Sequence, residues 1–283
     1  MSGQLAEVAA RLDSTRQLGS VISAMRAIAA SRSQQARREL EAIRLYAATI
    51  GQAIDQVLGS LPAGQSIAPP TARSDGVLVV ALCAEQGFAG SFNERVLDVA
   101  LPLADEGDGH LFVVGDRGLM VAGNRGRMPD WSAPMAAHTD EVSALADRIS
   151  DAVYAALASH GPGRVLLVYG SPAEGEEPAI VRRWLLPFDF GRFPARLAAG
   201  RGPLMNLPPP LLLEQLAVEY VHADLCEALM LSYAAENQAR MQAMIAAHGN
   251  LERTEAALTL QFQRVRQEDI TDEILELSAT RTR

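Results

Sequence analysis

The chain has 283 residues, of which 48% are hydrophobic and 21% charged, a composition typical of a soluble globular protein with one large or two modest domains. Its net charge of -9 argues against a protein that mainly binds nucleic-acid phosphates. All 25 basic residues are arginine, and a chain without lysine cannot form a Walker A phosphate loop, a Schiff base or a pyridoxal-phosphate site.

No stretch reaches the roughly 18 uncharged apolar residues that a membrane-spanning helix needs, and the start lacks a signal-peptide pattern. We therefore expect the protein to stay inside the cell, with any membrane association made through partners. Cys83 and Cys226 stand in unrelated segments without a CxxC or Cys/His cluster, so we expect two buried structural thiols.

A long helix is predicted at the start, over residues 1–59, because no proline occurs between Gln4 and Leu58. Its apolar or small positions recur with a mean spacing near that of a coiled-coil seam. Gly19 interrupts the helix at a cost of about 1 kcal/mol relative to alanine. The predicted seam comprises Leu5, Val8, Leu12, Thr15, Leu18, Ile22, Met25 and Ala29. Residues 59–75, rich in Pro, Ser and Gly, read as a linker.

The middle of the chain, residues 76–200, alternates strand-like and helix-like segments and is predicted to be a Rossmann-like α/β domain. Its short apolar runs are typical of strands buried on both faces of a parallel sheet. The predicted strands are Val77–Cys83, Leu111–Val114, Val165–Tyr169 and an antiparallel edge strand, Ile180–Leu186. The predicted helices are Phe92–Ala104, Arg117–Arg125 and Thr139–His160.

A second long helix is predicted over residues 208–283, since no proline follows Pro208–Pro210. Leu251, Leu258, Phe262 and Val265 form its apolar seam. At about 1.5 Å per residue, neither long helix fits inside a compact globule of this length, so both should protrude. The economical way to bury two seams is an antiparallel coiled coil. The predicted fold class is therefore α/β, with a coiled coil of the terminal helices beside the central domain.

No catalytic or metal-binding constellation is predicted. Gly115–Gly118 (GDRG) follows a strand but lacks the GxGxxG spacing, so we interpret it as a strand-to-helix turn rather than a nucleotide site. The five histidines are scattered over different elements, and neither a GxSxG serine nor a His partner for Cys83 is evident. We therefore expect no cofactor and no metal.

A basic cluster on the first helix comprises Arg26, Arg32, Arg37, Arg38 and Arg44. The ordinary interpretation of such a run is a solvated face. The alternative is a contact with acidic loops of a partner. The residues alone favour the solvated face.

Both ends of the chain resemble the gamma subunit of F-type ATP synthases. In the first helix the resemblance rests on Arg11–Ser14, Ala24-Met25, Ile28–Arg32 and Tyr46-Ala47. In the last helix it rests on Glu236–Met244 (ENQARMQAM) and Arg266–Glu273 (RQEDITDE), which are more specific. Glu85–Asn93 and Arg183–Pro187 match the family between them. Ala89, where the family has cysteine, and the polar ending Ser278–Arg283 depart from it and suggest a divergent bacterial form.

The resemblance implies a central rotor shaft that couples transmembrane ion flow to ATP synthesis or hydrolysis and has no catalytic site of its own. Its implied partners are the alpha and beta subunits, the epsilon subunit and the membrane c-ring, on the cytoplasmic side of the bacterial plasma membrane. Rotor–stator contact and coupling are expected at Met25, Arg26, Arg32, Arg37, Arg38, Arg240, Arg266, Gln267, Thr271 and Glu273.

The family's antiparallel arrangement leads us to expect Met25 against the helical turn that carries Gln267 and Thr271. Two other functions stay open on the residues alone. One is a coiled-coil adaptor or scaffold, and the other is a Rossmann-type nucleotide-binding enzyme with long helical ends.

Overall fold

The computed structural model describes residues 2–61, 76–159, 161–175, 177–193 and 204–280. The chain divides into two compact units. The two-helix unit contains residues 1–30 and 240–283, and the α/β unit contains residues 31–239. The long helices α1 (Ser2–Gly59) and α5 (Pro209–Thr280) contribute to both units. The sequence predicts each long helix as a domain of its own, whereas these units divide each helix between them. The expected domain boundaries stay a prediction.

The α/β unit is built on a five-stranded sheet with the order β3-β2-β1-β4-β5. All neighbouring strands run parallel except β4 and β5, so the antiparallel edge strand is confirmed. The strands are β1 (Val77–Leu82), β2 (His110–Val114), β3 (Trp131–Ala133), β4 (Arg164–Ser171) and β5 (Ala179–Leu186).

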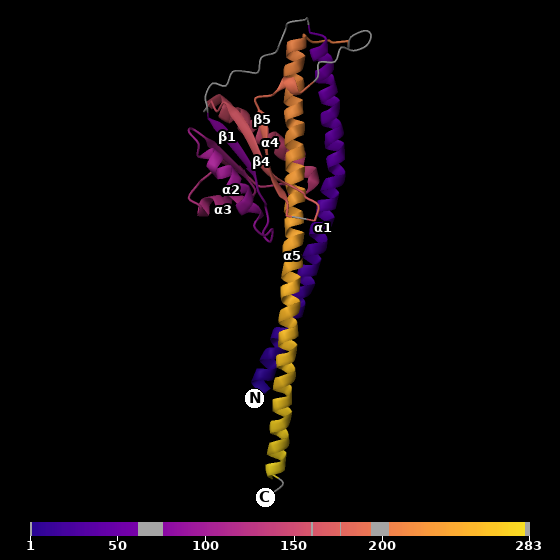
Figure 1. Ribbon diagram of the computed structural model, residues 1–283, viewed down its shortest axis with the longest axis vertical. Helices are drawn as coiled ribbons and strands as arrows, with labels where there is room; N and C mark the ends of the chain where they lie inside the picture. The colour runs from indigo at the N-terminus through magenta and orange to yellow at the C-terminus, as the bar shows by residue number, and fades with distance from the viewer. Residues whose placement is uncertain (1, 62–75, 160, 176, 194–203, 281–283) are drawn as a thin grey trace. The chain divides into compact units, whose positions relative to one another are not determined.

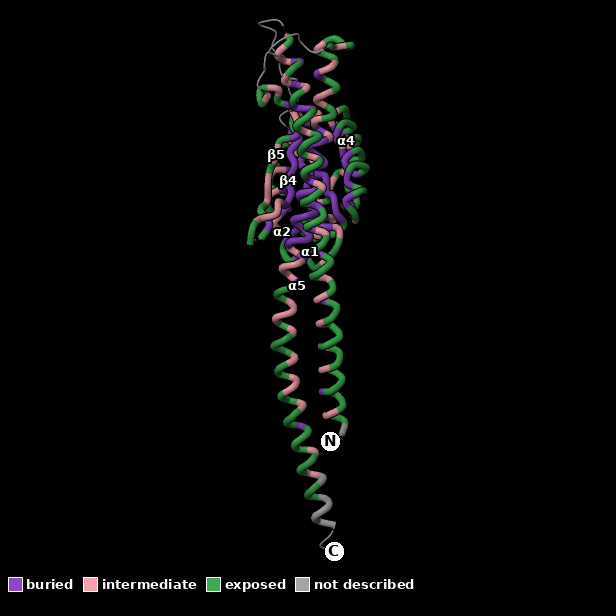
Figure 2. Tube along the Cα trace, turned by 90° about the vertical axis from the view of Figure 1, so that its right-hand side faces the viewer, coloured by how far each residue is buried: buried purple, intermediate pink, exposed green. Residues whose placement is uncertain are grey.

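Helices cover both faces of this sheet, because alternate residues of each strand point to opposite faces. On one face, Val79 and Ala81 of β1 pack in a core with α2 (Phe92–Ala104) and α3 (Asp116–Asn124). Figure 1 shows these two helices together beside the sheet. On the other face, Leu78, Val80 and Leu82 pack in a core with α4 and the parts of α1 and α5 that belong to this unit. The buried residues of Figure 2 concentrate in the α/β unit. Each large side chain buried there stabilises the fold by roughly 1.5–3 kcal/mol.

The last crossover, between β3 and β4, combines a short 3-10 helix η1 (Thr139–Glu141) with α4 (Val142–Ser159). A second 3-10 helix, η2 (Phe190–Arg192), follows β5. Strand β3, which pairs with β2 from Trp131 to Ala133, is not predicted from the sequence. Three residues are too few to show an alternating pattern, so only the pairing with β2 reveals this strand.

The two-helix unit pairs the start of α1 with the end of α5. Val8, Ile22 and Ala29 of α1 are buried, as is Val265 of α5, in agreement with the predicted seams. Leu18 is 53% exposed, so its predicted place in the seam is wrong. The helix turns Gly19 inward instead, where an added Cβ would lie 3.2 Å from the Leu251 Cδ2 atom. A glycine that looks like an interruption in the sequence therefore permits close helix contact.

The two helices of this unit run antiparallel, as predicted. The Arg16 Nε atom lies 2.8 Å from the Glu255 Oε1 atom, and Gly19 faces Leu251. Each step forward along α1 is thus matched by a step backward along α5. No helix in the described part of the chain is both long and apolar enough to cross a membrane.

Candidate functional site

The carboxyl edge of the sheet is where open α/β folds bind ligands, at the point where the chain's connections change direction. Here that point lies between β1 and β4. Helix α5 covers it: the Ser232 hydroxyl donates a hydrogen bond to the Leu82 carbonyl at 3.1 Å. A side chain at Gly170 would bring its Cβ within 3.0 Å of the Ala235 Cβ. The protein's own helix therefore occupies the usual ligand position.

Buried amides next to this contact complete the attachment of α5. The Gln238 side chain bonds both backbone groups of Ala173, donating to the carbonyl at 2.5 Å and accepting from the N–H at 3.2 Å. Asn237 donates to the Tyr233 carbonyl at 2.9 Å. Buried polar groups need such partners. The Asn237 bond stays within α5, whereas the two Gln238 bonds hold the helix against Ala173, which follows β4. These residues belong to the ENQARMQAM segment, and the Gln238 contact with Ala173 is not predicted from the sequence.

At the turn Gly115–Gly118, a carboxylate of the protein itself binds the start of α3. The Glu85 carboxylate accepts hydrogen bonds from the Asp116 N–H at 3.2 Å, at the start of α3, and from the Met135 N–H at 2.7 Å. Helix N-termini attract anions such as phosphate, and Glu85 takes that place. Gly115 has a φ of 103° and lies too close to the Cys83 carbonyl for any side chain. The structure confirms the strand-to-helix turn, and the Glu85 carboxylate accepts the hydrogen bond that an anion at the start of α3 would accept.

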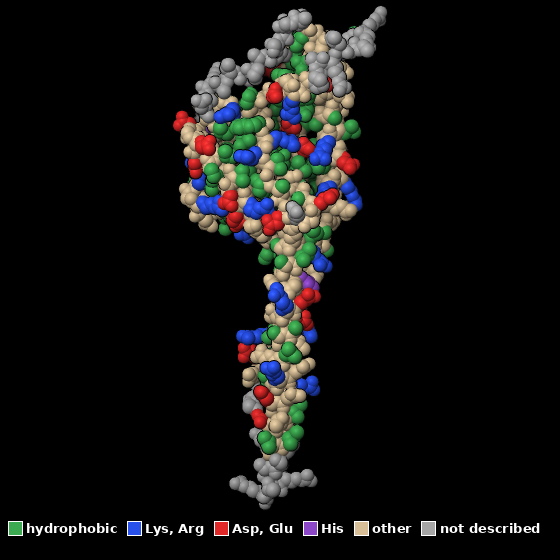
Figure 3. Space-filling model, in the orientation of Figure 1, with side chains coloured by type: hydrophobic (Ala, Val, Ile, Leu, Met, Phe, Trp, Pro, Cys, Tyr) green, Lys and Arg blue, Asp and Glu red, His purple; other side chains and the backbone are tan. Residues whose placement is uncertain are grey.

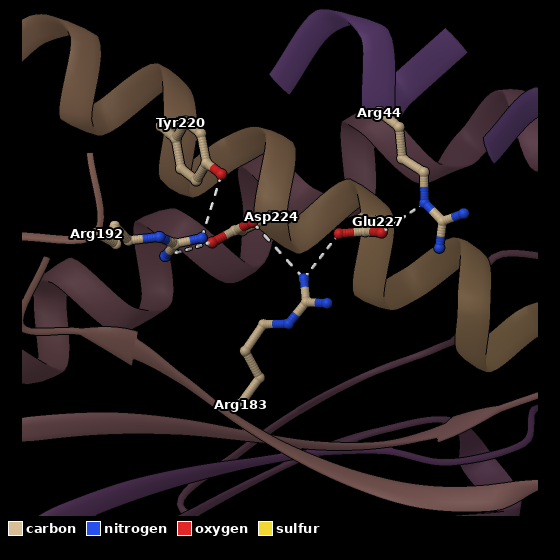
Figure 4. Close-up of polar contacts among 6 residues, drawn as sticks. All are labelled: Arg44, Arg183, Arg192, Tyr220, Asp224 and Glu227. Atoms are coloured by element: carbon tan, nitrogen blue, oxygen red, sulfur yellow. Dashed lines mark hydrogen bonds and ion pairs between the residues drawn. The ribbon is translucent and has the colours of Figure 1, made fainter. Parts of the chain in front are cut away.

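An ionic cluster joins α1, β5, η2 and α5 in the α/β unit (Figure 4). Arg183 lies between two carboxylates of α5, 2.8 Å from a Glu227 oxygen and 3.6 Å from an Asp224 oxygen. Each carboxylate has a second arginine. The other members are Arg44, 2.8 Å from Glu227; Arg192, 3.5 Å from Asp224; and Tyr220, whose hydroxyl accepts from Arg192 at 3.1 Å.

The two carboxylates of the ionic cluster have opposite pKa shifts. Burial raises the pKa of Asp224, and the attraction of Arg192 and Arg183 only partly offsets it. Burial also acts upward on the pKa of Glu227, but hydrogen bonds from Arg183 and Arg44 outweigh it and lower the pKa. The shorter contacts of Glu227 explain the difference, because charged hydrogen bonds weaken with distance.

The arginines of the predicted basic cluster differ in their exposure and in their partners. Arg44 pairs with Glu227 in the ionic cluster, while 57% of its side-chain surface stays exposed. Arg37 and Arg38 are exposed, and Arg37 reaches the Gln238 Oε1 atom at 3.5 Å. Arg26 is exposed and Arg32 half-buried. Arg26, Arg32 and Arg38 form no ion pair with any residue that the structure describes. Figure 3 shows basic and acidic side chains interspersed on the viewed face of the α/β unit.

The remaining predicted coupling residues differ in exposure. Arg240 is buried, with 6% of its surface exposed, so it does not present its side chain to solvent. Arg266, Gln267 and Thr271 are exposed. The Thr271 hydroxyl donates to the Gln267 carbonyl at 2.8 Å, as expected for one helical face. Glu273 continues helix α5, and its side chain lies outside the described residues.

The expected contact between Met25 and Thr271 is wrong. Met25 lies six residues after Gly19, and the antiparallel pairing places it opposite the residue six before Leu251, which is Ile245. At 1.5 Å per residue, the distance from there to Thr271 along α5 is about 39 Å. The expected contact rested on motifs that do not specify which residues of the two helices lie opposite each other. The Arg16–Glu255 and Gly19–Leu251 contacts specify this register.

Comparison with known proteins gives one consistent result. The family model described as ATP synthase matches residues 4–280. The ATP synthase gamma chain of Lachnoclostridium phytofermentans is 28% identical, covering 96% of both chains. The gamma chain of Beutenbergia cavernae is 29% identical, covering 94% of this chain and 93% of its own.

Solved structures share the fold at lower identity. A chain of the Euglena gracilis mitochondrial ATP synthase rotor has a TM-score of 0.68 and 13% identity, covering 95% of this chain and all of its own. A chain of the Tetrahymena thermophila mitochondrial ATP synthase central stalk and c-ring has a TM-score of 0.56 and 20% identity, covering 80% of this chain and 99% of its own. At these identities the likeness shows the fold alone.

The register of the two-helix unit can be tested by crosslinking in a Cys83→Ala/Cys226→Ala background. Gly19→Cys with Leu251→Cys should form a disulfide under mild oxidation, because the two positions face each other. Met25→Cys with Thr271→Cys should not. A crosslink in the second pair of monomeric protein, seen as a gel shift reversed by dithiothreitol, would contradict the register.

The ionic cluster predicts a pH-dependent stability. A carboxyl whose pKa is lowered by folding stabilises the protein above its unfolded pKa, near 4.5, and loses this effect as pH falls through the folded value. Glu227→Gln should therefore lower the free energy of unfolding by about 2 kcal/mol at neutral pH. The difference from wild type should shrink below about pH 4.

Urea unfolding at several pH values measures this effect. Asp98→Asn is the matched control, because it breaks the exposed Asp98–Arg125 pair and should cost under about 1 kcal/mol. A Glu227→Gln cost that stays constant from neutral to acidic pH would show that its charge does not contribute.

Proposed function

The chain belongs to the ATP synthase family, and as a gamma chain it is a non-catalytic stalk subunit; from this premise we propose how it works. The observation that carries the function is the match over residues 4–280, which includes both long helices and the sheet between them. An adaptor or scaffold of another class has no comparable support.

We propose that the two-helix unit lies within an alternating ring of alpha and beta subunits. A stiff, asymmetric helix pair offers a different surface to each catalytic subunit, so its angle can favour a different conformation in each. The chemistry then belongs to the ring, while this chain transmits torque from transmembrane ion flow.

The basic side chains of α1 support a contact with acidic loops of the beta subunits. Arg32, Arg37 and Arg38 form no ion pair among the described residues, so their charges stay available for a partner. The ordinary alternative, a solvated face, gives the same exposure in the isolated chain, and only the assembled complex distinguishes the two. Arg26, which lies in the two-helix unit, is proposed to contact the same loops.

The end of α5 supports a second contact with the ring. Ser2, the first residue of α1, lies seventeen residues before Gly19, and the residue opposite it is number 268, seventeen after Leu251. The pairing with the described residues of α1 ends at that position. Ile270, Ile274 and Leu275 are exposed beyond it at 47%, 61% and 60%. Apolar side chains so exposed fit burial against a partner. Gln267 and Thr271 lie in the same stretch.

We propose that the α/β unit contacts the epsilon subunit and the c-ring, following the resemblance. The chain would then be held on the cytoplasmic side of a bacterial plasma membrane by its partners, as part of the membrane-associated F1 complex. The bacterial relatives support that location.

Co-expression with the alpha and beta subunits of the same genome tests the function. The purified complex should contain one copy of this chain and hydrolyse ATP, because one asymmetric shaft makes the three catalytic sites inequivalent. The chain alone should have no ATPase activity. Activity in the isolated chain, with contamination excluded, would overturn the non-catalytic assignment.

Substitution in the whole membrane-bound ATP synthase tests the basic cluster. Arg32→Gln/Arg37→Gln/Arg38→Gln should lower ion-driven ATP synthesis per assembled complex and leave the melting temperature nearly unchanged, since exposed charges contribute under about 1 kcal/mol. Arg44→Gln is the contrast, because its ion pair with Glu227 predicts a loss of stability. A triple variant that melts early yet synthesises ATP normally would make the cluster structural.

A further inference from the structure

A thiol and an imidazole meet on α5 in the α/β unit. The Cys226 Sγ atom lies 3.4 Å from the Nε2 atom of His222, one helical turn earlier. The Ser143 hydroxyl of α4 lies 3.4 Å from the same nitrogen. The sequence alone predicts an isolated structural thiol here. The four-residue spacing of His222 and Cys226 was visible in the sequence, but a single such pair is too common to be a signal.

A carboxylate orients this imidazole. The Asp147 Oδ1 atom of α4 lies 3.2 Å from the His222 Nδ1 atom. A neutral histidine with its proton on Nδ1, held by the carboxylate, has its Nε2 lone pair directed toward the thiol. Cysteine, histidine and aspartate thus have the order that nucleophilic enzymes use to remove a proton from a thiol or hydroxyl.

The thiol borders an open cavity of about 580 Å³ between α1, η1, α4 and α5. Acidic groups dominate its charged lining, with Glu39, Asp140 and Glu219 joining His222 and Cys226. Glu39 accepts from the Thr139 hydroxyl at 2.9 Å, and Glu219 accepts from the Tyr46 hydroxyl at 2.8 Å. A cavity with several fixed carboxylates attracts cations and repels anions.

Burial raises the pKa of the Cys226 thiol to about 11, and the charge of Asp147 acts in the same direction. The thiol therefore carries its proton at neutral pH. Because the free thiolate is scarce, any reaction at this sulfur depends on a base that accepts the proton as the sulfur attacks.

We propose that Cys226 is a covalent modification site that reacts with small, positively charged disulfides, with His222 as its general base. This site is separate from the proposed rotor contacts, and it does not rest on them. The acidic lining of the cavity favours a positively charged reagent, and the cavity has room for the group that becomes attached to Cys226.

The reaction is a thiol–disulfide exchange. The Cys226 sulfur attacks one sulfur of the reagent, its proton passes to His222 Nε2, and a new S–S bond forms as the reagent's S–S bond breaks. The departing thiolate takes the proton from His222 and leaves as a free thiol. The protein thiol is oxidised and the reagent disulfide is reduced, so atoms and electrons balance.

The second cysteine is an internal control. Cys83 is buried beneath α3, where an added Cβ on Gly118 would collide with the Cys83 side chain. Burial raises the pKa of its thiol, and the charges of Glu236 and Glu94 act in the same direction. Only Cys226 has both a base and a cavity, so the folded chain should be modified at a single position.

The full-length chain, incubated at neutral pH with cystamine, tests the proposal. Intact mass and peptide mapping should show one adduct, at Cys226, in the folded protein and adducts at both cysteines after unfolding in urea. Dithiodiglycolate, an anionic disulfide of similar size, should react about 10-fold more slowly. This preference should weaken at high salt.

Substitution of the base separates catalysis from simple exposure. His222→Gln should slow the cystamine reaction about 100-fold, whereas His248→Gln, which changes a histidine beside Glu252 instead, should not change it. Circular dichroism confirms that each variant is folded. An unmodified Cys226, an unchanged rate in His222→Gln, or equal rates with the two disulfides would each overturn the proposal.

Discussion

The contact between α5 and the carboxyl edge of the sheet is the constraint on which the α/β unit depends. Strands β1 and β4 end there with backbone groups that, in many folds of this type, face a bound nucleotide. Ser232 and Gln238 bond those groups, and Ala235 packs against Gly170. A Rossmann-like layer has thereby become the support of a helix instead of a ligand site, which suits a subunit that transmits force without chemistry.

The ionic cluster fixes the same helix at Asp224 and Glu227, eleven residues or about three turns before Ala235 and Gln238. Pairing charges away from water contributes little net stability, but separating them is expensive, so such groups specify one arrangement. Arg44 of α1 and Arg183 of β5 meet at Glu227 of α5, which joins three elements at one point. We infer that this cluster fixes how α1 and α5 align within the α/β unit. In the two-helix unit, the Gly19–Leu251 contact fixes the alignment instead.

The sequence predicts the elements well where the signal is long or strongly apolar. Helices α1 and α5, strands β1, β2, β4 and β5, and the antiparallel edge all follow from proline spacing and apolar runs. Strand β3 does not, because it is three residues long. Spacing alone predicts Leu18 in the seam, yet the helix turns Gly19 inward. Spacing gives a periodicity but not the phase of each turn.

The site was less predictable, because its features depend on partners far apart in the sequence. Arg44 looks like its neighbours on α1, and only the fold places it beside Glu227. Gln238 and Ser232 are polar residues in a helix, with no local sign that the sheet edge needs their hydrogen bonds. The Met25–Thr271 pairing failed for the same reason, since helix motifs do not state which residue lies opposite them.

Direct observation of rotation distinguishes a shaft from a static scaffold. The alpha and beta subunits are fixed to a surface, and a gold particle is attached through Asp108→Cys, an exposed position in the turn between α2 and β2, in a Cys83→Ala/Cys226→Ala background. ATP should drive stepwise turning of the particle in one direction. ATP hydrolysis by the same immobilised complexes at full rate, with the particle stationary, would contradict the assignment of this chain as the rotor.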